Sequence, residues 1–200
     1  MTTSLSNKAV LTCHPETPSQ AVQEIEVCAG WTQDHTLIFT YALKADLTHL
    51  RIPPPRPPRK ADRLWQHTCF EAFVSVKDKT EYYEFNFAPS GEWAAYSFQG
   101  YRDGCPFEGD RLAPRISVSN TADRFDLHAI VRLDHLPTIA SHACLLFALS
   151  AVIEDQSGKL SYWALRHPPG KPDFHHPDSF ALKLDSPMQQ TPNKPAMERR

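Results

Sequence analysis

Alternation of apolar and polar residues recurs along most of this chain and constrains its fold more than any other feature. This period of two is the pattern of half-buried β-strands, and turn sequences such as Pro89-Ser90-Gly91 separate the segments that carry it. We therefore predict an all-β fold, namely an antiparallel β-sandwich of the jelly-roll or immunoglobulin-like kind with about ten strands. Clear examples are the segments Leu37–Leu43, Phe70–Val76, Tyr83–Phe87 and Phe125–Val131.

Proline content supports an all-β interpretation. The 200 residues include 18 prolines but only 7 glycines, and each proline removes an amide donor and hinders helix formation. The length fits one domain. Because both ends are polar and contain proline, we expect residues 1–20 to be a mobile N-terminal segment and residues 185–200 a disordered tail. Residues 21–184 should form the single sandwich domain.

Composition excludes several classes of partner. The net charge of −2 provides no basic surface for nucleic acid, and no apolar run reaches the length of a membrane-spanning helix. Residues Met1–Gln20 lack the pattern of a signal peptide, and the five cysteines include no C-x-x-C pair. We therefore expect a cytoplasmic protein with no nucleic-acid or membrane partner. The oligomeric state cannot be read from the sequence.

Catalytic motifs are missing from the sequence. It contains no G-x-S-x-G, H-E-x-x-H or phosphate-binding loop, so a binding module is favoured over an enzyme. Two alternatives stay open. One is an enzyme that acts through Glu71 with His67 or His167. The other is an interaction scaffold that uses the proline segment Pro53–Pro58, although a stiff crossover between two sheets is the favoured role of that segment.

A carboxylate in the middle of an apolar strand is the first candidate for binding chemistry. If Phe70, Ala72 and Val74 face the core, Glu71 shares the opposite face with Cys69 and Phe73. A charge on such a face is costly unless it is paired or solvated. Glu84 and Asn86 lie on an equivalent face of the following strand. These groups fit either a site for a polar ring-shaped ligand or a buried hydrogen-bond network, and we favour the network for Glu84.

The segment Arg166–Pro177 is the second candidate. A strand ends at Arg166 and His167 and continues into a proline-rich loop that carries Asp173, His175 and His176. A rigid loop can present these side chains at low entropic cost. Their spacing matches no established metal-ligand pattern, so the sequence predicts no metal site.

Together with Tyr101-Arg102-Asp103-Gly104, these regions resemble the DOMON-like superfamily, specifically its branch similar to carbohydrate-binding family 9 and the small DOMON-like proteins of unassigned function. The residues that carry the resemblance are Leu64–Phe73, Tyr83–Trp93, Tyr101–Gly104 and Trp163–Phe180. The match spans about Val22 to Leu184. It implies a jelly-roll-like sandwich with a sugar or a haem held on its concave face or at its strand-end loops.

The sugar-binding branch holds a pyranose ring between two tryptophans, with polar side chains on its hydroxyls. The resemblance therefore implies Trp65 and Trp163 as the ring pair and Trp93 as a third candidate. It implies polar partners from the matching blocks, namely Glu71, Asn86, Arg102 and Arg166. With His167, Asp173 and His175 of the loop, these are the expected ligand-binding residues, and the expected ligand is a sugar-like small molecule.

The haem-binding branch uses a methionine and a histidine as axial ligands. In this chain Met1, Met188 and Met197 all fall in the expected end segments. Ligation by two histidines is the remaining route to haem. We therefore predict no cofactor, with a haem-binding protein as the alternative.

Overall fold

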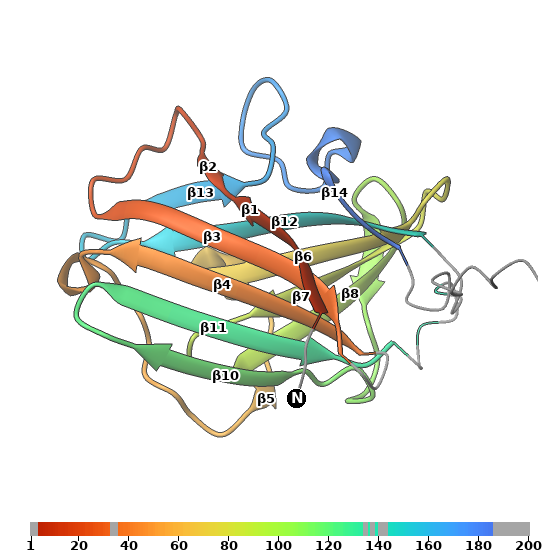
Figure 1. Ribbon diagram of the computed structural model, residues 1–200, viewed down its shortest axis with the longest axis horizontal. Coiled ribbons are helices and arrows are strands. Elements are labelled where there is room, and N and C mark those ends of the chain that lie inside the picture. The colour runs from red at the N-terminus through yellow and green to blue at the C-terminus, as the bar shows by residue number, and fades with distance from the viewer. Residues whose placement is uncertain (1–3, 33–35, 134–135, 137–138, 140–143, 186–200) are drawn as a thin grey trace, which may run out of the picture.

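A computed structural model describes residues 4–32, 36–133, 136, 139 and 144–185. Two sheets lie face to face (Figure 1). The five-stranded sheet lies in front in this view and the nine-stranded sheet lies behind it. All strand pairs in the described ranges are antiparallel except one, in which β5 runs parallel to β8. The predicted antiparallel β-sandwich is confirmed.

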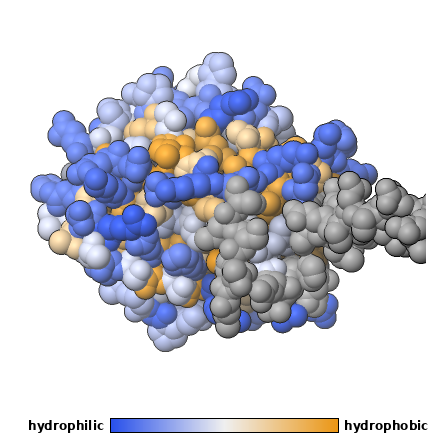
Figure 2. Space-filling model, viewed as in Figure 1, coloured by the Kyte–Doolittle hydropathy of each residue, from blue (hydrophilic) through white to orange (hydrophobic). Residues whose placement is uncertain are grey.

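The five-stranded sheet has the order β1-β3-β4-β11-β10. Its strands are β1 (Ser4–Val10), β3 (Val22–Trp31), β4 (Leu37–Ala45), β11 (Arg124–Val131) and β10 (Arg115–Asn120). The outer face of this sheet, seen in Figure 2, is a mixture of hydrophilic and hydrophobic residues, as expected for a face in contact with solvent.

The nine-stranded sheet has the order β2-β13-β12-β6-β7-β8-β5, with β14 paired to β12 and β9 paired to β8. Its strands are β2 (Thr12–Cys13), β13 (Leu160–Ala164), β12 (Cys144–Glu154), β6 (Cys69–Val76), β7 (Tyr82–Phe87), β8 (Glu92–Gly100), β5 (Arg59–Lys60), β14 (Leu182–Asp185) and β9 (Asp103–Pro106). Ten of the strands in the described residues have five residues or more, and four short ones make up the rest.

The main core fills the space between the two sheets. Each of the central strands contributes every second side chain to it, as the period of two predicts. Phe39 of β4, Phe85 of β7 and Phe147 of β12 are fully buried there. Tyr41 is buried among them, and its hydroxyl donates a hydrogen bond of 2.7 Å to the backbone carbonyl of Glu71.

The outer face of the nine-stranded sheet carries a second apolar cluster. Phe73, Tyr82 and Phe98 lie on this face of β6, β7 and β8. The loop 165–181 between β13 and β14 covers part of it, because Phe174 belongs to the same cluster and Phe180 packs against it. This sheet is therefore partly buried on both sides.

The expectation of a mobile segment over residues 1–20 is wrong for the part that forms strands. Strand β1 pairs with β3 from Val10–Glu26 to Ser4–Trp31, and β2 pairs with β13. Strands β1 and β2 are edge strands, and their pairing satisfies backbone groups of β3 and β13 that would otherwise be unpaired. Residues 186–200, expected to be a tail, lie outside the described residues.

The proline segment Pro53–Pro58 lies in the connection between β4 of one sheet and β6 of the other, which confirms the crossover interpretation. Its ends are held by backbone hydrogen bonds, from the Arg51 amide to Glu154 and from the Arg56 amide to Ser90. All five cysteines are free thiols. Within the described ranges, no helix is long and apolar enough to span a bilayer.

Candidate functional site

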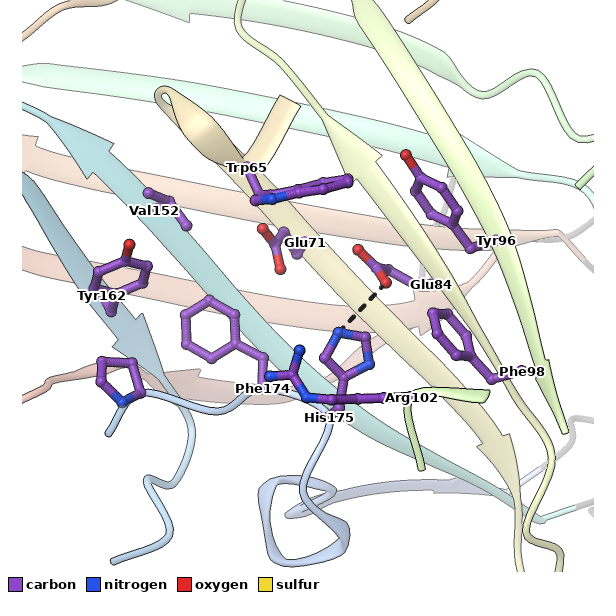
Figure 3. Close-up of a pocket in the computed structure, with 11 residues that line it drawn as sticks. Trp65, Glu71, Glu84, Tyr96, Phe98, Arg102, Val152, Tyr162, Phe174 and His175 are labelled. Atoms are coloured by element: carbon purple, nitrogen blue, oxygen red, sulfur yellow. Dashed lines mark ion pairs between the residues drawn. The ribbon is translucent and has the colours of Figure 1, made fainter. Parts of the chain in front are cut away.

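A cavity of about 320 Å³ opens on the outer face of the nine-stranded sheet (Figure 3). Strands β6, β7, β8, β12 and β13 form its floor. The 3₁₀ turn η2 (Leu64–Gln66), the turn after β8 and the loop 165–181 form its walls. Its lining residues are Trp65, Glu71, Glu84, Tyr96, Phe98, Arg102, Val152, Tyr162, Pro172, Phe174 and His175.

Two carboxyl groups, from Glu71 of β6 and Glu84 of β7, lie next to each other on the floor. In the antiparallel register Glu71 faces Asn86 and Phe73 faces Glu84, so the two glutamates are diagonal neighbours on one face. Figure 3 shows both carboxyl groups on the same side of the sheet, with Trp65 close to Glu71. The sequence alternation correctly placed Glu71, Glu84 and Asn86 on one face.

Glu71 is the more deeply buried of the pair, with 2% of its surface exposed. Its Oε1 atom makes no hydrogen bond within the described part of the chain. Burial raises the pKa of Glu71 well above its usual range, and the neighbouring charge of Glu84 raises it further. A buried oxygen without a partner is costly, so this atom is available for a ligand.

Glu84 is held from two sides. Asn86 Nδ2 donates to Glu84 Oε1 over 2.6 Å, and His175 Nε2 lies 3.8 Å from Glu84 Oε2. Burial raises the pKa of Glu84 to about 7, although the hydrogen bond from Asn86 opposes the shift. Asn86 is fully buried beneath the cavity and acts through Glu84. Glu84 thus belongs both to the expected network and to the cavity lining.

His175 packs over the apolar cluster and is neutral near pH 7. Burial, together with the charge of Arg102, lowers its pKa to about 4, although the charge of Asp173 opposes the shift. The Tyr82 hydroxyl accepts a hydrogen bond from the Arg102 amide and lies 2.9 Å from His175 Nδ1. The other ring nitrogen, Nε2, faces Glu84. Their 3.8 Å contact is therefore not an ion pair at neutral pH.

Arg102 stands at the rim of the cavity in a left-handed backbone conformation, with φ of 56°. Its Nη2 donates to Asp173 Oδ1 over 2.8 Å, and the Tyr101 hydroxyl donates to Asp173 Oδ2 over 2.6 Å. Burial opposes ionisation of Asp173, but these two hydrogen bonds outweigh it and lower the pKa of Asp173. Asp173 is therefore a counterion for Arg102 and orients it.

Trp65 forms the exposed aromatic wall. It retains 39% exposure, and its ring meets the edge of Tyr96 at a centroid distance of 5.9 Å. The Tyr96 hydroxyl donates to Asp62 Oδ1 over 2.6 Å, which ties the loop before η2 to β8. Burial and this hydrogen bond raise the pKa of Tyr96, so its hydroxyl stays protonated. Trp65 is thus held in place with one face open.

Several lining residues were not predicted as site residues. These are Glu84, for which a buried network was favoured, and Tyr96, Phe98, Val152, Tyr162, Pro172 and Phe174. The alternation along β8 predicted part of this lining, because it places Tyr96 and Phe98 on one face of the strand and Trp93 and Ala95 on the other. Gly104 lets β9 close against Phe98, since a Cβ atom there would lie only 2.6 Å from the Ser97 carbonyl oxygen.

The expected tryptophan pair does not form. Trp163 and Trp93 are 6% and 3% exposed and belong to the core between the sheets. The indole nitrogen of Trp163 donates to Ser161 Oγ over 3.0 Å inside that core. The reason is strand parity: Tyr162, one position before Trp163, points to the cavity, so Trp163 points away from it.

Arg166 and His167 also lie away from the cavity. They line a separate shallow groove with Thr12 and His14, where His167 Nε2 lies 2.8 Å from the Thr12 carbonyl oxygen. The rings of His14 and His167 meet edge to face at 4.8 Å. Of the ten expected site residues, the cavity thus brings together Trp65, Glu71, Arg102 and His175, with Asn86 and Asp173 in supporting contact.

Metal-ligating side chains do not converge here. Among the residues that the structure describes, no group of three or more His, Cys, Asp or Glu side chains could hold a metal ion. What the cavity offers is aromatic surface, a carboxyl oxygen in need of a partner, and a guanidinium group at the rim. These are groups for hydrogen bonding and ring stacking.

Comparison with solved structures shows the same fold in carbohydrate-binding proteins. A candidate carbohydrate-binding protein from Bacteroides uniformis superposes with a TM-score of 0.65 at 14% identity, over 87% of this chain and 84% of that chain. A family 9 carbohydrate-binding module from Caldicellulosiruptor kristjanssonii, solved with cellotriose, has a TM-score of 0.52 at 11% identity, over 82% of this chain and 74% of that chain. No protein-family model matches the sequence, and no curated protein matches it.

Proposed function

We propose that this protein is a non-catalytic module that binds a small carbohydrate in the cavity on the outer face of its nine-stranded sheet. The observation that carries the proposal is the open face of Trp65 beside the buried carboxyl groups of Glu71 and Glu84 in one cavity. A pyranose has an apolar C–H face and a rim of hydroxyls, and this cavity offers a surface for each.

The aromatic walls supply the stacking surface. Trp65 and Tyr96 meet edge to face on one side, and Phe174 and Tyr162 meet at a centroid distance of 6.0 Å on another. These rings are already positioned by their own contacts, so little side-chain entropy is lost when a sugar binds. A cavity of about 320 Å³ lies at the lower end of the range of small-molecule sites and suits a monosaccharide or the end of a longer chain.

The polar groups fix the orientation of the bound sugar. Glu71 Oε1 is unpaired on the floor, and the guanidinium of Arg102 is oriented at the rim by Asp173. Planar carboxyl and guanidinium groups can each bind two neighbouring hydroxyls. The fold shared with carbohydrate-binding proteins agrees with this function. Membership of the DOMON-like superfamily and a location in the cytoplasm are part of the same proposal, the latter supported by five free thiols.

Isothermal titration against a panel of neutral and charged mono- and oligosaccharides tests the proposal. We expect weak but saturable binding of at least one sugar, because few atoms are buried in a site of this size. Trp65→Ala should abolish the heat signal. Arg166→Ala is the matched control, since Arg166 is exposed and lies in the separate groove. Flat titrations for every sugar would reject the proposal.

The proposed site works without a cofactor. An absorption spectrum of protein expressed with a haem precursor separates it from the haem alternative. We expect no Soret band, and a stoichiometric band would favour haem binding instead.

A further inference from the structure

The floor of the cavity carries carboxyl oxygens that are free to accept hydrogen bonds from a ligand. Glu71 Oε1 makes no hydrogen bond within the described residues. Glu84 Oε2 is 3.8 Å from the nearest imidazole nitrogen, beyond hydrogen-bond distance. Two neighbouring carboxyl groups on one floor therefore each present an oxygen to the cavity.

The charges around this floor are not balanced. Arg102 is the cationic residue that lines the cavity, and its guanidinium is already engaged by Asp173 at 2.8 Å. His175 stays neutral near pH 7 because burial disfavours its charged form. When ionised, the two carboxyl groups of Glu71 and Glu84 thus have only the charge of Arg102, which is shared with Asp173, to balance them in the cavity lining.

The walls favour a cation as well. Trp65, Tyr96, Phe98, Tyr162 and Phe174 present aromatic rings to the cavity. The negative faces of aromatic rings attract ammonium groups, and this attraction grows when the site is desolvated. Aromatic walls around paired carboxyl groups are the chemistry that binds a compact organic cation.

We propose that the ligand of this site is an amino sugar, a saccharide whose protonated primary amine is bound by Glu71 and Glu84. This inference rests on the proposed carbohydrate function and names its ligand class. An ammonium group has three donors and no acceptor, and the carboxyl oxygens of Glu71 and Glu84 on the floor can accept from it. The rest of the sugar ring stacks against Trp65, and its hydroxyls reach Arg102 at the rim.

Binding of the ammonium group is coupled to proton release. In the empty site burial favours the protonated form of both glutamates, and the charge of Glu84 favours it further in Glu71. A bound cation replaces those protons, so affinity for an amino sugar should rise with pH until the amine loses its own proton. The groups that face the glutamates and contribute to this balance are Cys69, Tyr96, Arg102, Ser150, Tyr162, Asp173 and His175.

Titration of four related sugars tests the inference: glucosamine, N-acetylglucosamine, glucose and glucuronate. At neutral pH we expect glucosamine to bind about tenfold more tightly than N-acetylglucosamine or glucose, because a charge-assisted hydrogen bond contributes at least that factor. Glucuronate should bind most weakly. Between pH 5.5 and 7 the affinity for glucosamine should rise by about a factor of ten per unit in the steepest part, with release of protons measured in buffers of different ionisation heat.

Glu71→Gln is the deciding variant, because it keeps the shape of the side chain and removes the charge. We expect it to lose the preference for glucosamine over glucose, whereas Arg166→Ala should keep it. Circular dichroism confirms that each variant is folded. Equal binding of glucose and glucosamine, or a preference for glucuronate, would overturn the amino-sugar inference and leave the carbohydrate function intact. No binding of any of these sugars or of the wider panel would reject both.

Discussion

The two faces of the nine-stranded sheet are built by the same strands, yet they differ in chemistry. On the inner face, Phe70 and Ala72 of β6 and Phe85 of β7 are fully buried against the five-stranded sheet. On the outer face, the same strands place Glu71 and Glu84 under a cavity. A whole sheet closes the inner face, whereas only a turn and a loop cover the outer one. A fold can therefore tolerate buried carboxyl groups where the covering layer is incomplete.

The largest expected effect comes from the inner face. Phe85→Ala removes a fully buried ring and should lower the free energy of unfolding by about 3–5 kcal/mol, because the surrounding sheets cannot close the resulting void. Urea denaturation monitored by tryptophan fluorescence measures this loss. Ser119→Ala, at an exposed position of β10, is the control and should change stability by less than about 0.5 kcal/mol. A similar result for both would contradict the assigned inner face.

The pH dependence of stability separates two groups on the outer face. Burial raises the pKa of Glu84 from 4.5 to about 7. Its contribution to the free energy of unfolding is therefore full below pH 4.5 and is lost as the pH rises to 7. Burial lowers the pKa of His175 from 6.5 to about 4, so its contribution is full above pH 6.5 and is lost as the pH falls to 4. Between these limits the two slopes oppose each other.

Single substitutions should expose each slope. In Glu84→Gln, the unfolding free energy should fall less with rising pH than in the wild type between about pH 4.5 and 6.5, because the Glu84 slope is removed while the opposing slopes of Glu71 and His175 remain. In His175→Gln it should fall as the pH rises to 7, since Glu84 then acts with Glu71, whose pKa burial also raises. Each change should be on the order of 2–3 kcal/mol. Urea denaturation across this pH range measures both, and parallel curves for the wild type and the two variants would refute the assignment.

A smaller effect is expected at a hydrogen bond that links the inner core to the strand carrying Glu71. The hydroxyl of Tyr41 reaches across the core and donates to the backbone carbonyl of Glu71 over 2.7 Å. Tyr41→Phe removes this buried bond, so stability should fall by about 1–2 kcal/mol. The position of Glu71 should also loosen, which would lower sugar affinity. Tyr83→Phe on the inner face of β7 serves as the comparison for loss of a hydroxyl outside this contact. Unchanged stability in Tyr41→Phe would show that the bond contributes nothing.

The smallest effect on stability is expected at the cavity wall. Trp65→Ala should cost on the order of 1 kcal/mol, well below the cost of Phe85→Ala, since 39% of the residue is already exposed. Thermal unfolding followed by circular dichroism measures this cost. The same variant should abolish sugar binding. A large loss of stability would show that Trp65 is mainly a packing residue. The outer face would then resemble the packed inner face.

The predicted tryptophan pair shows where reasoning from the sequence was wrong. The resemblance implies Trp65 and Trp163 as a pair because both lie in matching motif blocks. Trp163, however, points into the core, and Tyr162 takes the position on the cavity face. The contribution of Phe174 was missed because it comes from a loop, where no period links a residue to a face. The alternation does not tell whether residues from different strands and turns converge, and the structure brings Trp65, Glu71 and Arg102 to one cavity without Trp163.

The sequence by itself determined the strands and the sets of residues that share a face, because side chains alternate with a strict period of two. It placed Glu71 with Glu84 and Asn86, and Trp93 opposite Tyr96. The tertiary structure alone decided which face is covered by the second sheet. Along β6 both faces are buried and rich in apolar residues, so alternation is symmetric there and cannot tell inside from outside. Only the packing of the five-stranded sheet on one side and the loop 165–181 on the other creates the cavity.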